Sequence, residues 1–167
     1  MEAEFHEAIN NRSDRWFSAC LRITRNRDMA EDAVQEALLT AWNKRDQFQH
    51  DARLDTWIHR IAVNAALQQL RKNRPGRFEP LETDVEDRAD TPETIVANAD
   101  LGDHLAAALE NLTEIERVCF VLMHLEQWRL KEIADEIGSN VSSVKQALFR
   151  AVRKLRTRMT DIKSTGS

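Results

Sequence analysis

The feature that most constrains the fold is a central stretch of sequence that cannot fold by itself. The chain has three prolines and they fall close together: Pro75, Pro80 and Pro92. Around them, residues 79–93 carry seven acidic side chains against a single basic one. Such a segment buries too little apolar surface to offset the conformational entropy lost on folding. We therefore expect a flexible acidic linker at residues 75–98, which reaches ~80 Å at most when fully stretched.

This linker divides the chain into two small domains, which we place at residues 1–74 and 99–163. Strand signals are nearly absent from both, because the chain has no tyrosine, only 4 glycines, and no Asn-Gly or Asp-Gly pair. Apolar residues recur at helical spacing instead. The sequence predicts an all-α protein made of two small helical domains.

The two cysteines, Cys20 and Cys119, lie in apolar helical patterns with no second thiol or histidine at metal-ligand spacing. We expect two buried free thiols, no metal and no other cofactor. No apolar run approaches the ~18 residues that a membrane-spanning helix needs, and the sequence shows no signal peptide. We therefore expect a cytoplasmic protein without membrane insertion.

An enzyme is one alternative, and its candidate residues are His50, Asp51 and His59. These side chains form no metal-ligand or nucleophile–base pattern, and loop solvation or helix packing explains them equally well. The sequence predicts no catalytic residues. If the protein were an enzyme, these three residues would fit a nuclease, and a divalent-metal-dependent cleavage assay would test that.

Residues 133–155 have the spacing of a helix-turn-helix. Ala134 is small enough to let two helices approach, Gly138 turns the chain, and Val144 packs beneath the second helix. Either Asn140 or Ser142 is placed to cap that second helix. Its expected buried stripe comprises Val144, Leu148, Ala151 and Leu155.

The outer face of the second helix is basic, although the formal net charge of the chain is −4. Residues 139–160 carry six basic side chains and no acidic one. Amide, hydroxyl and cationic groups near the start of a helix suit base edges in a major groove, whereas later cations suit phosphates. The candidates for base edges are Ser142, Ser143, Lys145, Gln146, Phe149, Arg150 and Arg153, and those for phosphates are Lys154, Arg156 and Arg158.

Two further helices are expected in the first domain. In the helix at 28–42, Asp28 and Glu31 resemble a capping box, and the expected inward face is Ala30, Val34, Ala37, Leu38 and Ala41. The opposite face holds Asp32, Gln35, Glu36 and Leu39, which periodicity alone explains as a solvated surface.

The helix at 53–72 has an expected core stripe of Leu54, Trp57, Ile58, Ile61 and Ala65. A different face mixes charge and amide: Arg60, Asn64, Gln68 and Arg71. The loop before it places an aromatic residue, Phe48, among polar ones, which suits the capture of an unstacked base. We assign Trp57 to packing, since a tryptophan at helical spacing is usually a core residue.

Three stretches together resemble the bacterial extracytoplasmic-function (ECF) sigma factors of the sigma-70 family. They are AEDAVQEALLTAW at 30–42, ARLDTWIHRIAVNAALQQLR at 52–71, and LTEIERVCFVLMHLEQWRLKEIADEIGSNVSSVKQALFRAVRKLR at 112–156. The resemblance covers nearly the whole chain, in the order expected of that family. It implies a region 2 domain, the linker and a region 4 domain.

The resemblance also implies roles for individual residues. Asp32, Gln35, Glu36 and Leu39 would contact the clamp helices of the polymerase β′ subunit, in contrast to the solvated face suggested by periodicity. Phe48, Arg60 and Asn64 would capture a flipped base of the −10 element. The −35 duplex would be read by the helix-turn-helix, with Lys145, Gln146, Phe149 and Arg150 facing the bases.

The partners implied by the resemblance are core RNA polymerase, through its β′ clamp helices and β flap, promoter DNA, and an anti-sigma factor. The second alternative is a stand-alone helix-turn-helix regulator. Such regulators usually dimerise on two half-sites, and the sequence shows no obvious dimerisation helix. A regulator of that class would bind DNA tightly without polymerase, whereas a sigma factor depends on the core enzyme.

Overall fold

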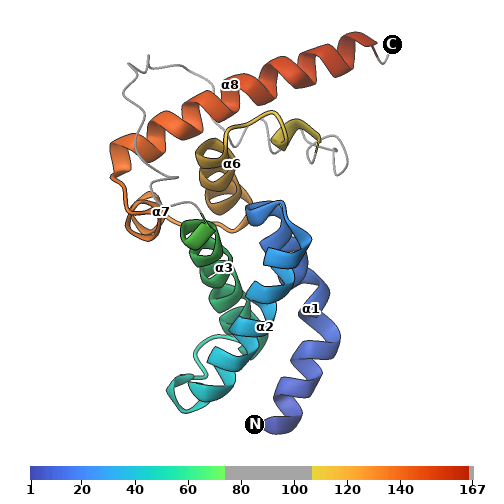
Figure 1. Ribbon diagram of the computed structural model, residues 1–167, viewed down its shortest axis with the longest axis vertical. Coiled ribbons are helices and arrows are strands. Elements are labelled where there is room, and N and C mark those ends of the chain that lie inside the picture. The colour runs from blue at the N-terminus through green and yellow to red at the C-terminus, as the bar shows by residue number, and fades with distance from the viewer. Residues whose placement is uncertain (74–106, 166–167) are drawn as a thin grey trace. The chain divides into compact units, whose positions relative to one another are not determined.

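The protein folds into two separate helical units (Figure 1). The computed structural model describes residues 1–73 and 107–165, and the linker expected at 75–98 lies outside them. The units are Met1–Pro75 and Gly76–Ser167. Every regular element in the described residues is helical, which confirms the prediction of an all-α chain with two helical bodies. Within those residues, no helix has an apolar stretch long enough to cross a bilayer.

The first unit is a bundle of three helices, each in contact with the other two: α1 (Glu2–Thr24), α2 (Arg27–Asn43) and α3 (Leu54–Asn73). A short 3-10 turn, η1 (Arg45–Gln47), follows α2. The largest fully buried side chains of the bundle come from α1 and α3: Trp16, Ile23, Ile58, Val63, Leu67 and Leu70. Of the predicted α3 stripe, Ile58 and Ala65 are buried, whereas Leu54, Trp57 and Ile61 are half-buried.

Helix α2 contributes small side chains to this core. The buried row consists of Ala30, Ala33, Ala37 and Ala41, each at most 1% exposed. The prediction of Val34 and Leu38 as inward residues is wrong in part, since both are half-buried while Ala33 takes the central position. Alanines spaced three or four apart let helix backbones approach closely, so the line of contact follows them rather than the bulkier pair.

The corner between α1 and α2 is only two residues long. Arg25 adopts a left-handed conformation with φ 55°, and its N–H donates to the Leu21 carbonyl at 2.7 Å. Asn26 is extended, and its Oδ1 accepts the Met29 N–H at 3.0 Å. The predicted Asp28–Glu31 capping box is therefore wrong. The helix starts at Arg27, so Asp28 lies inside its first turn. A negative charge there interacts favourably with the helix dipole and stabilises the helix.

The second unit packs two shorter helices against a long one. Helix α6 (Glu114–Phe120) continues into a π-helical turn, η2 (Val121–Leu125), and is followed by α7 (Leu130–Ile137) and α8 (Val141–Thr165). Both α6 and α7 contact α8. The predicted buried stripe of α8 is confirmed for all four residues: Val144, Leu148, Ala151 and Leu155.

Both cysteines are buried free thiols, as predicted. Cys20 Sγ donates to the Ala62 carbonyl at 3.4 Å and so helps to join α1 to α3. Burial raises the pKa of Cys119 to about 12, so this thiol stays protonated at neutral pH.

Candidate nucleic-acid interface

The turn of the helix-turn-helix is built by backbone hydrogen bonds around Gly138. This glycine ends α7 with φ 71° and ψ 37°, a left-handed conformation that glycine adopts without steric cost. The Ser139 N–H donates to the Ala134 carbonyl at 2.8 Å, and the Gly138 N–H donates to the Asp135 carbonyl at 3.4 Å. The pair forms a Schellman motif. The prediction that Gly138 ends the first helix is confirmed.

Asn140, rather than Ser142, caps the second helix. Its Oδ1 accepts the Ser143 N–H at 2.8 Å, and its carbonyl accepts the Val144 N–H at 3.1 Å. The turn thus spans only the residues between Ile137 and Val141. A turn this short fixes the direction in which α8 leaves α7.

Six of the seven predicted base-edge residues lie on the accessible side of α8. Ser142, Lys145 and Arg153 are exposed, and Gln146, Phe149 and Arg150 are half-buried. The Arg153 guanidinium lies over the Phe149 ring, 5.9 Å from its centroid.

Ser143 departs from the expected outer face, because it is only 9% exposed. It stands one turn before Ala147 and two turns before Ala151, and that row packs inward. Of the predicted phosphate contacts, Lys154 is exposed and Arg156 half-buried, whereas the side chain of Arg158 lies outside the described part.

A buried acid, Glu116, which the sequence did not single out, lies beneath this basic face. Glu116 on α6 is 1% exposed, and its two carboxylate oxygens meet two bases of α8. Arg150 Nε donates to Oε2 at 3.2 Å, and Lys154 Nζ donates to Oε1 at 2.6 Å. The two bases are four residues apart, so they are neighbours on one face of the helix.

The same carboxylate also caps its own helix. The Thr113 N–H donates to Glu116 Oε1 at 3.0 Å, and the Glu116 N–H donates to Thr113 Oγ1 at 3.3 Å. This capping box, Thr-x-x-Glu, is a local pattern from which Glu116 was recognisable in the sequence. Burial raises the pKa of Glu116, but the hydrogen bonds from Lys154 and the Thr113 backbone outweigh it, and the pKa lies below its ordinary 4.5.

The loop between η1 and α3 carries a small aromatic cluster. The Phe48 ring lies 5.2 Å from the Trp57 ring and 4.7 Å from the His50 ring, tilted by 34° and 35°. Phe48 and Trp57 are both half-buried. Trp57 therefore packs against the loop, as well as against its own bundle, and gives Phe48 a fixed support.

Arg60 and Asn64 lie one turn apart on α3 and are half-buried. Asn64 Oδ1 is buried and accepts no hydrogen bond from the described residues. A buried acceptor without a donor is costly, by about 1–3 kcal/mol.

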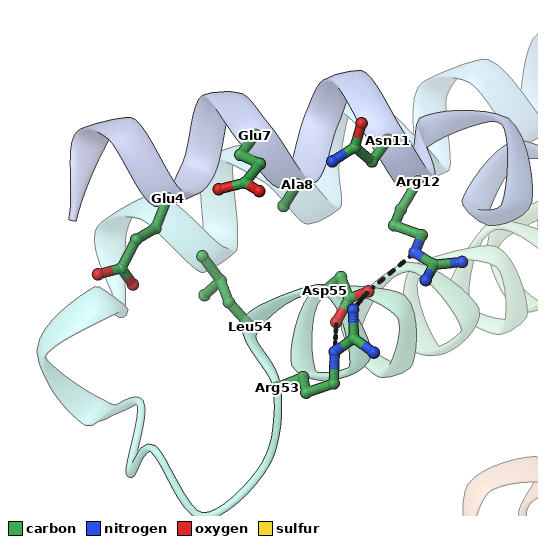
Figure 2. Close-up of a pocket in the computed structure, with 8 residues that line it drawn as sticks. All are labelled: Glu4, Glu7, Ala8, Asn11, Arg12, Arg53, Leu54 and Asp55. Carbon is green, nitrogen blue, oxygen red and sulfur yellow. Dashed lines mark hydrogen bonds and ion pairs between the residues drawn. The ribbon is translucent and has the colours of Figure 1, made fainter.

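Asp55, in the first turn of α3, holds the end of the loop between η1 and α3 in place. Figure 2 shows its carboxylate between two guanidinium groups, that of Arg12 on α1 and that of Arg53 just before α3. Arg12 Nε is 3.0 Å from Oδ2, Arg53 Nε is 3.2 Å from Oδ1, and the Asp55 side chain is 14% exposed. An open pocket of about 600 Å³ beside the pair is also lined by Glu4 and Glu7. The ion pairs tie the loop to α1.

The outer face of α2 presents an exposed leucine among polar side chains. Leu39 is 68% exposed, and Asp32 and Gln35 are also exposed. Glu36 is half-buried, and its Oε2 accepts from Gln69 Nε2 on α3 at 3.5 Å. Next to this face, α1 and α2 border an apolar hollow of about 260 Å³, lined mainly by Phe5, Ile9, Leu38 and Trp42.

The three residues considered for an enzyme lie in the loop before α3 and on α3 itself. His50 and Asp51 are exposed in the loop, and His59 is half-buried on α3. Among the residues that the structure describes, no three His, Cys, Asp or Glu side chains are placed to hold a metal ion.

Replacing Glu116 with Gln is expected to lower the melting temperature of the second unit at neutral pH, since Arg150 and Lys154 then face an uncharged amide. A carboxyl group whose pKa is lowered by folding stabilises the fold above its unfolded pKa, near 4.5, and loses that contribution as the pH falls through the folded value. The difference in melting temperature should hold above about pH 6 and shrink below about pH 4.5.

Scanning calorimetry from neutral to acid pH measures this difference. The exposed Asp135, replaced with Asn, is the control for loss of an acidic charge and should show no comparable difference. A Glu116 effect that stays constant into the acid range would contradict the assignment of the charge.

Replacing Asp55 with Asn is expected to loosen the loop at 44–53, because the anchor to Arg12 is weakened. Loss of ~1 kcal/mol of local stability would speed amide hydrogen exchange in the loop about fivefold. Exchange followed by mass spectrometry measures this, with the exposed Asp46 replaced by Asn as control. Equal exchange in Asp55→Asn and the unchanged protein would show that the ion pair is not the anchor.

Comparison with known families matches each unit separately. The model for sigma-70 region 2 matches residues 9–75, and the model for sigma-70 region 4 matches residues 103–155. Residues 9–75 contain the aromatic loop and its anchor, and residues 103–155 contain the helix-turn-helix.

Individual sigma factors are similar over most of the chain. The ECF RNA polymerase sigma factor SigM of Mycobacterium tuberculosis is 31% identical over 152 residues, covering 89% of this chain and 74% of SigM. SigG of the same species is 36% identical over 163 residues, but the chain spans only 44% of SigG. SigW of Bacillus subtilis is 27% identical, covering 95% of this chain and 90% of SigW.

The fold is similar to a solved structure, the sigma factor RpoE of Bartonella quintana in complex with the anti-sigma factor NepR. The TM-score is 0.57 at 24% identity, covering 93% of this chain and 96% of the solved one. Sigma factors are transcription initiation factors rather than enzymes. With region 2, region 4 and SigM all matched, the chain belongs to the ECF sigma factors of the sigma-70 family.

Proposed function

We propose that this protein binds core RNA polymerase in the cytoplasm and directs it to specific promoters, reading the −35 element as duplex and opening the −10 element. The observation that carries this proposal is the accessible basic face of α8, held by a helix-turn-helix in a chain whose other unit matches region 2. The protein performs no bond chemistry itself, because the polymerase supplies it.

The −35 duplex is read by α8 in the major groove. Lys145, Gln146, Phe149 and Arg150 face base edges, and Ser142 and Arg153 flank them. Ser143 contributes packing and a capped backbone N–H more than its hydroxyl, since that side chain is 9% exposed. Lys154 contacts phosphate, which adds affinity without sequence information.

The −10 element is captured by the first unit. Phe48, supported by Trp57, offers a ring on which an extruded base stacks. Arg60 and Asn64, both half-buried on α3, border the capture site. Opening a base pair costs a few kcal/mol, so these contacts have to offset that cost.

The clamp helices of the polymerase β′ subunit dock on α2. Asp32, Gln35 and Glu36 supply polar contacts around Leu39. Leu39 is 68% exposed, which is high for a leucine side chain. Burial of such a side chain contributes about 1.5–3 kcal/mol to binding. The second unit contacts the β flap.

An anti-sigma factor inhibits the protein when transcription of its target genes is not needed. The support is the likeness in fold to RpoE, a sigma factor solved with NepR bound. Such a partner inhibits by covering the α2 or α8 face, because each is needed for a different contact of the initiation complex.

In vitro transcription with purified core polymerase and fragmented genomic DNA tests the proposal. The protein is expected to direct initiation from a discrete set of start sites that share −35 and −10 sequences, while core enzyme alone does not. Tight sequence-specific binding without core polymerase, and no effect on initiation with it, would overturn the proposal in favour of a stand-alone regulator.

Replacing Leu39 with Lys is expected to weaken binding of core polymerase about tenfold or more, because a charge replaces the apolar anchor. Surface plasmon resonance with immobilised core enzyme measures it. Ser18, exposed on α1, replaced with Lys is the control for added charge. Undiminished capture of Leu39→Lys would remove α2 from the polymerase interface.

A further inference from the structure

The basic face of α8 contains a contact that a solvated helix surface does not need. Arg150 and Lys154 converge on one carboxylate, that of Glu116, which belongs to a different helix and is 1% exposed. The side chain of Arg150 retains 20% exposure and that of Lys154 retains 41%. Both bases are thus accessible from the outer face while they are bound from beneath.

We propose that Glu116 is a positioning residue for promoter recognition, which sets how Arg150 and Lys154 are presented to duplex DNA without touching it. This inference rests on the proposed function of α8. Nothing in the family matches or in the predicted base contacts assigns a role to this glutamate, which lies on α6 outside the helix-turn-helix.

The geometry of the arginine contact supports positioning. Glu116 Oε2 accepts from Nε, the nitrogen closest to the backbone, at 3.2 Å. The guanidinium is planar, so one fixed Nε–H direction restricts the orientation of the whole group. A long, freely rotating arginine loses up to ~2 kcal/mol of rotamer entropy when it binds a base. A guanidinium already held by Glu116 loses less.

The lysine contact supports the same role. Lys154 Nζ donates to Oε1 at 2.6 Å, and the Thr113 N–H donates to that same oxygen at 3.0 Å. Glu116 is therefore fixed from its own helix as well as from α8. A carboxylate bound by both helices restrains the position of α8 relative to α6.

The carboxylate also adjusts the charge of the surface. Arg150 and Lys154 together carry a formal charge of +2, and the carboxylate of Glu116 beneath them reduces the charge of the group to +1. Binding to arbitrary DNA depends on this cationic charge, whereas recognition depends on fixed donors. Removing the acid should therefore weaken specific binding while it preserves or strengthens non-specific binding. A purely structural role predicts that both fall together.

The test compares variants of the full chain, each assembled with core polymerase. The wild-type holoenzyme first identifies a promoter by start-site mapping, and affinity is then measured for that promoter and for the same DNA with the −35 element scrambled. The ratio of the two affinities is the readout. Glu116→Gln is expected to reduce the ratio about tenfold with non-specific affinity unchanged or raised.

A double-mutant cycle shows whether Glu116 acts through Arg150. If it does, adding Glu116→Gln to Arg150→Ala changes the ratio no further, since the group to be positioned has gone. Equal reductions of the ratio in the presence and absence of Arg150 would overturn the proposal, as would a ratio unaffected by Glu116→Gln.

Glu116→Asp is the second variant, and it decides the matter should Glu116→Gln melt below the assay temperature. It keeps the charge but withdraws the carboxylate by one methylene, so the ratio should fall without a gain in non-specific affinity. An unchanged ratio for a folded Glu116→Asp overturns the proposal. Failure of the wild-type holoenzyme to prefer any promoter would instead overturn the proposed function itself.

Discussion

A carboxylate removed from water has to meet positive charge or hydrogen-bond donors, because its desolvation is otherwise too costly. In the second unit this requirement links the elements that matter most. Glu116 is buried where α6 packs on α8, and its partners are two bases of α8 and the backbone of Thr113. The packing of α6, the start of α6 and the presentation of the basic face therefore depend on one side chain.

In the first unit, a partly buried acid is likewise paired with basic side chains, beside the loop between η1 and α3. Asp55, 14% exposed, lies between Arg12 and Arg53 and so joins the beginning of α3 to α1. The loop that ends there carries Phe48, which Trp57 supports from α3. In each unit one acid restrains two basic side chains: Asp55 holds Arg12 and Arg53, and Glu116 holds Arg150 and Lys154.

What the sequence predicted correctly was largely local. Gly138 ends a helix because its conformation is set by its own backbone, and the stripe from Val144 to Leu155 follows from the helical period. Errors arose where two helices pack. Ser143 faces inward because it lies in the same buried row of α8 as Ala147 and Ala151. The local sequence indicates the capping role of Glu116, but its pairing with Arg150 and Lys154 depends on the packing of α6 against α8. Asn26 replaced Asp28 as the cap because the corner after α1 is so short.

The net charge of −4 is consistent with the proposed function, although DNA is also an anion. If the proposed function is correct, a net negative charge gives the free chain little general attraction to phosphates, and we expect its non-specific DNA binding to be weak. In our proposal, recognition relies on a few cations with restrained positions, and Glu116 restrains Arg150 and Lys154 in this way. Weak general affinity and restrained donors act in the same direction. Under the proposed function, both make DNA binding depend on the correct sequence and on the polymerase to which the protein binds.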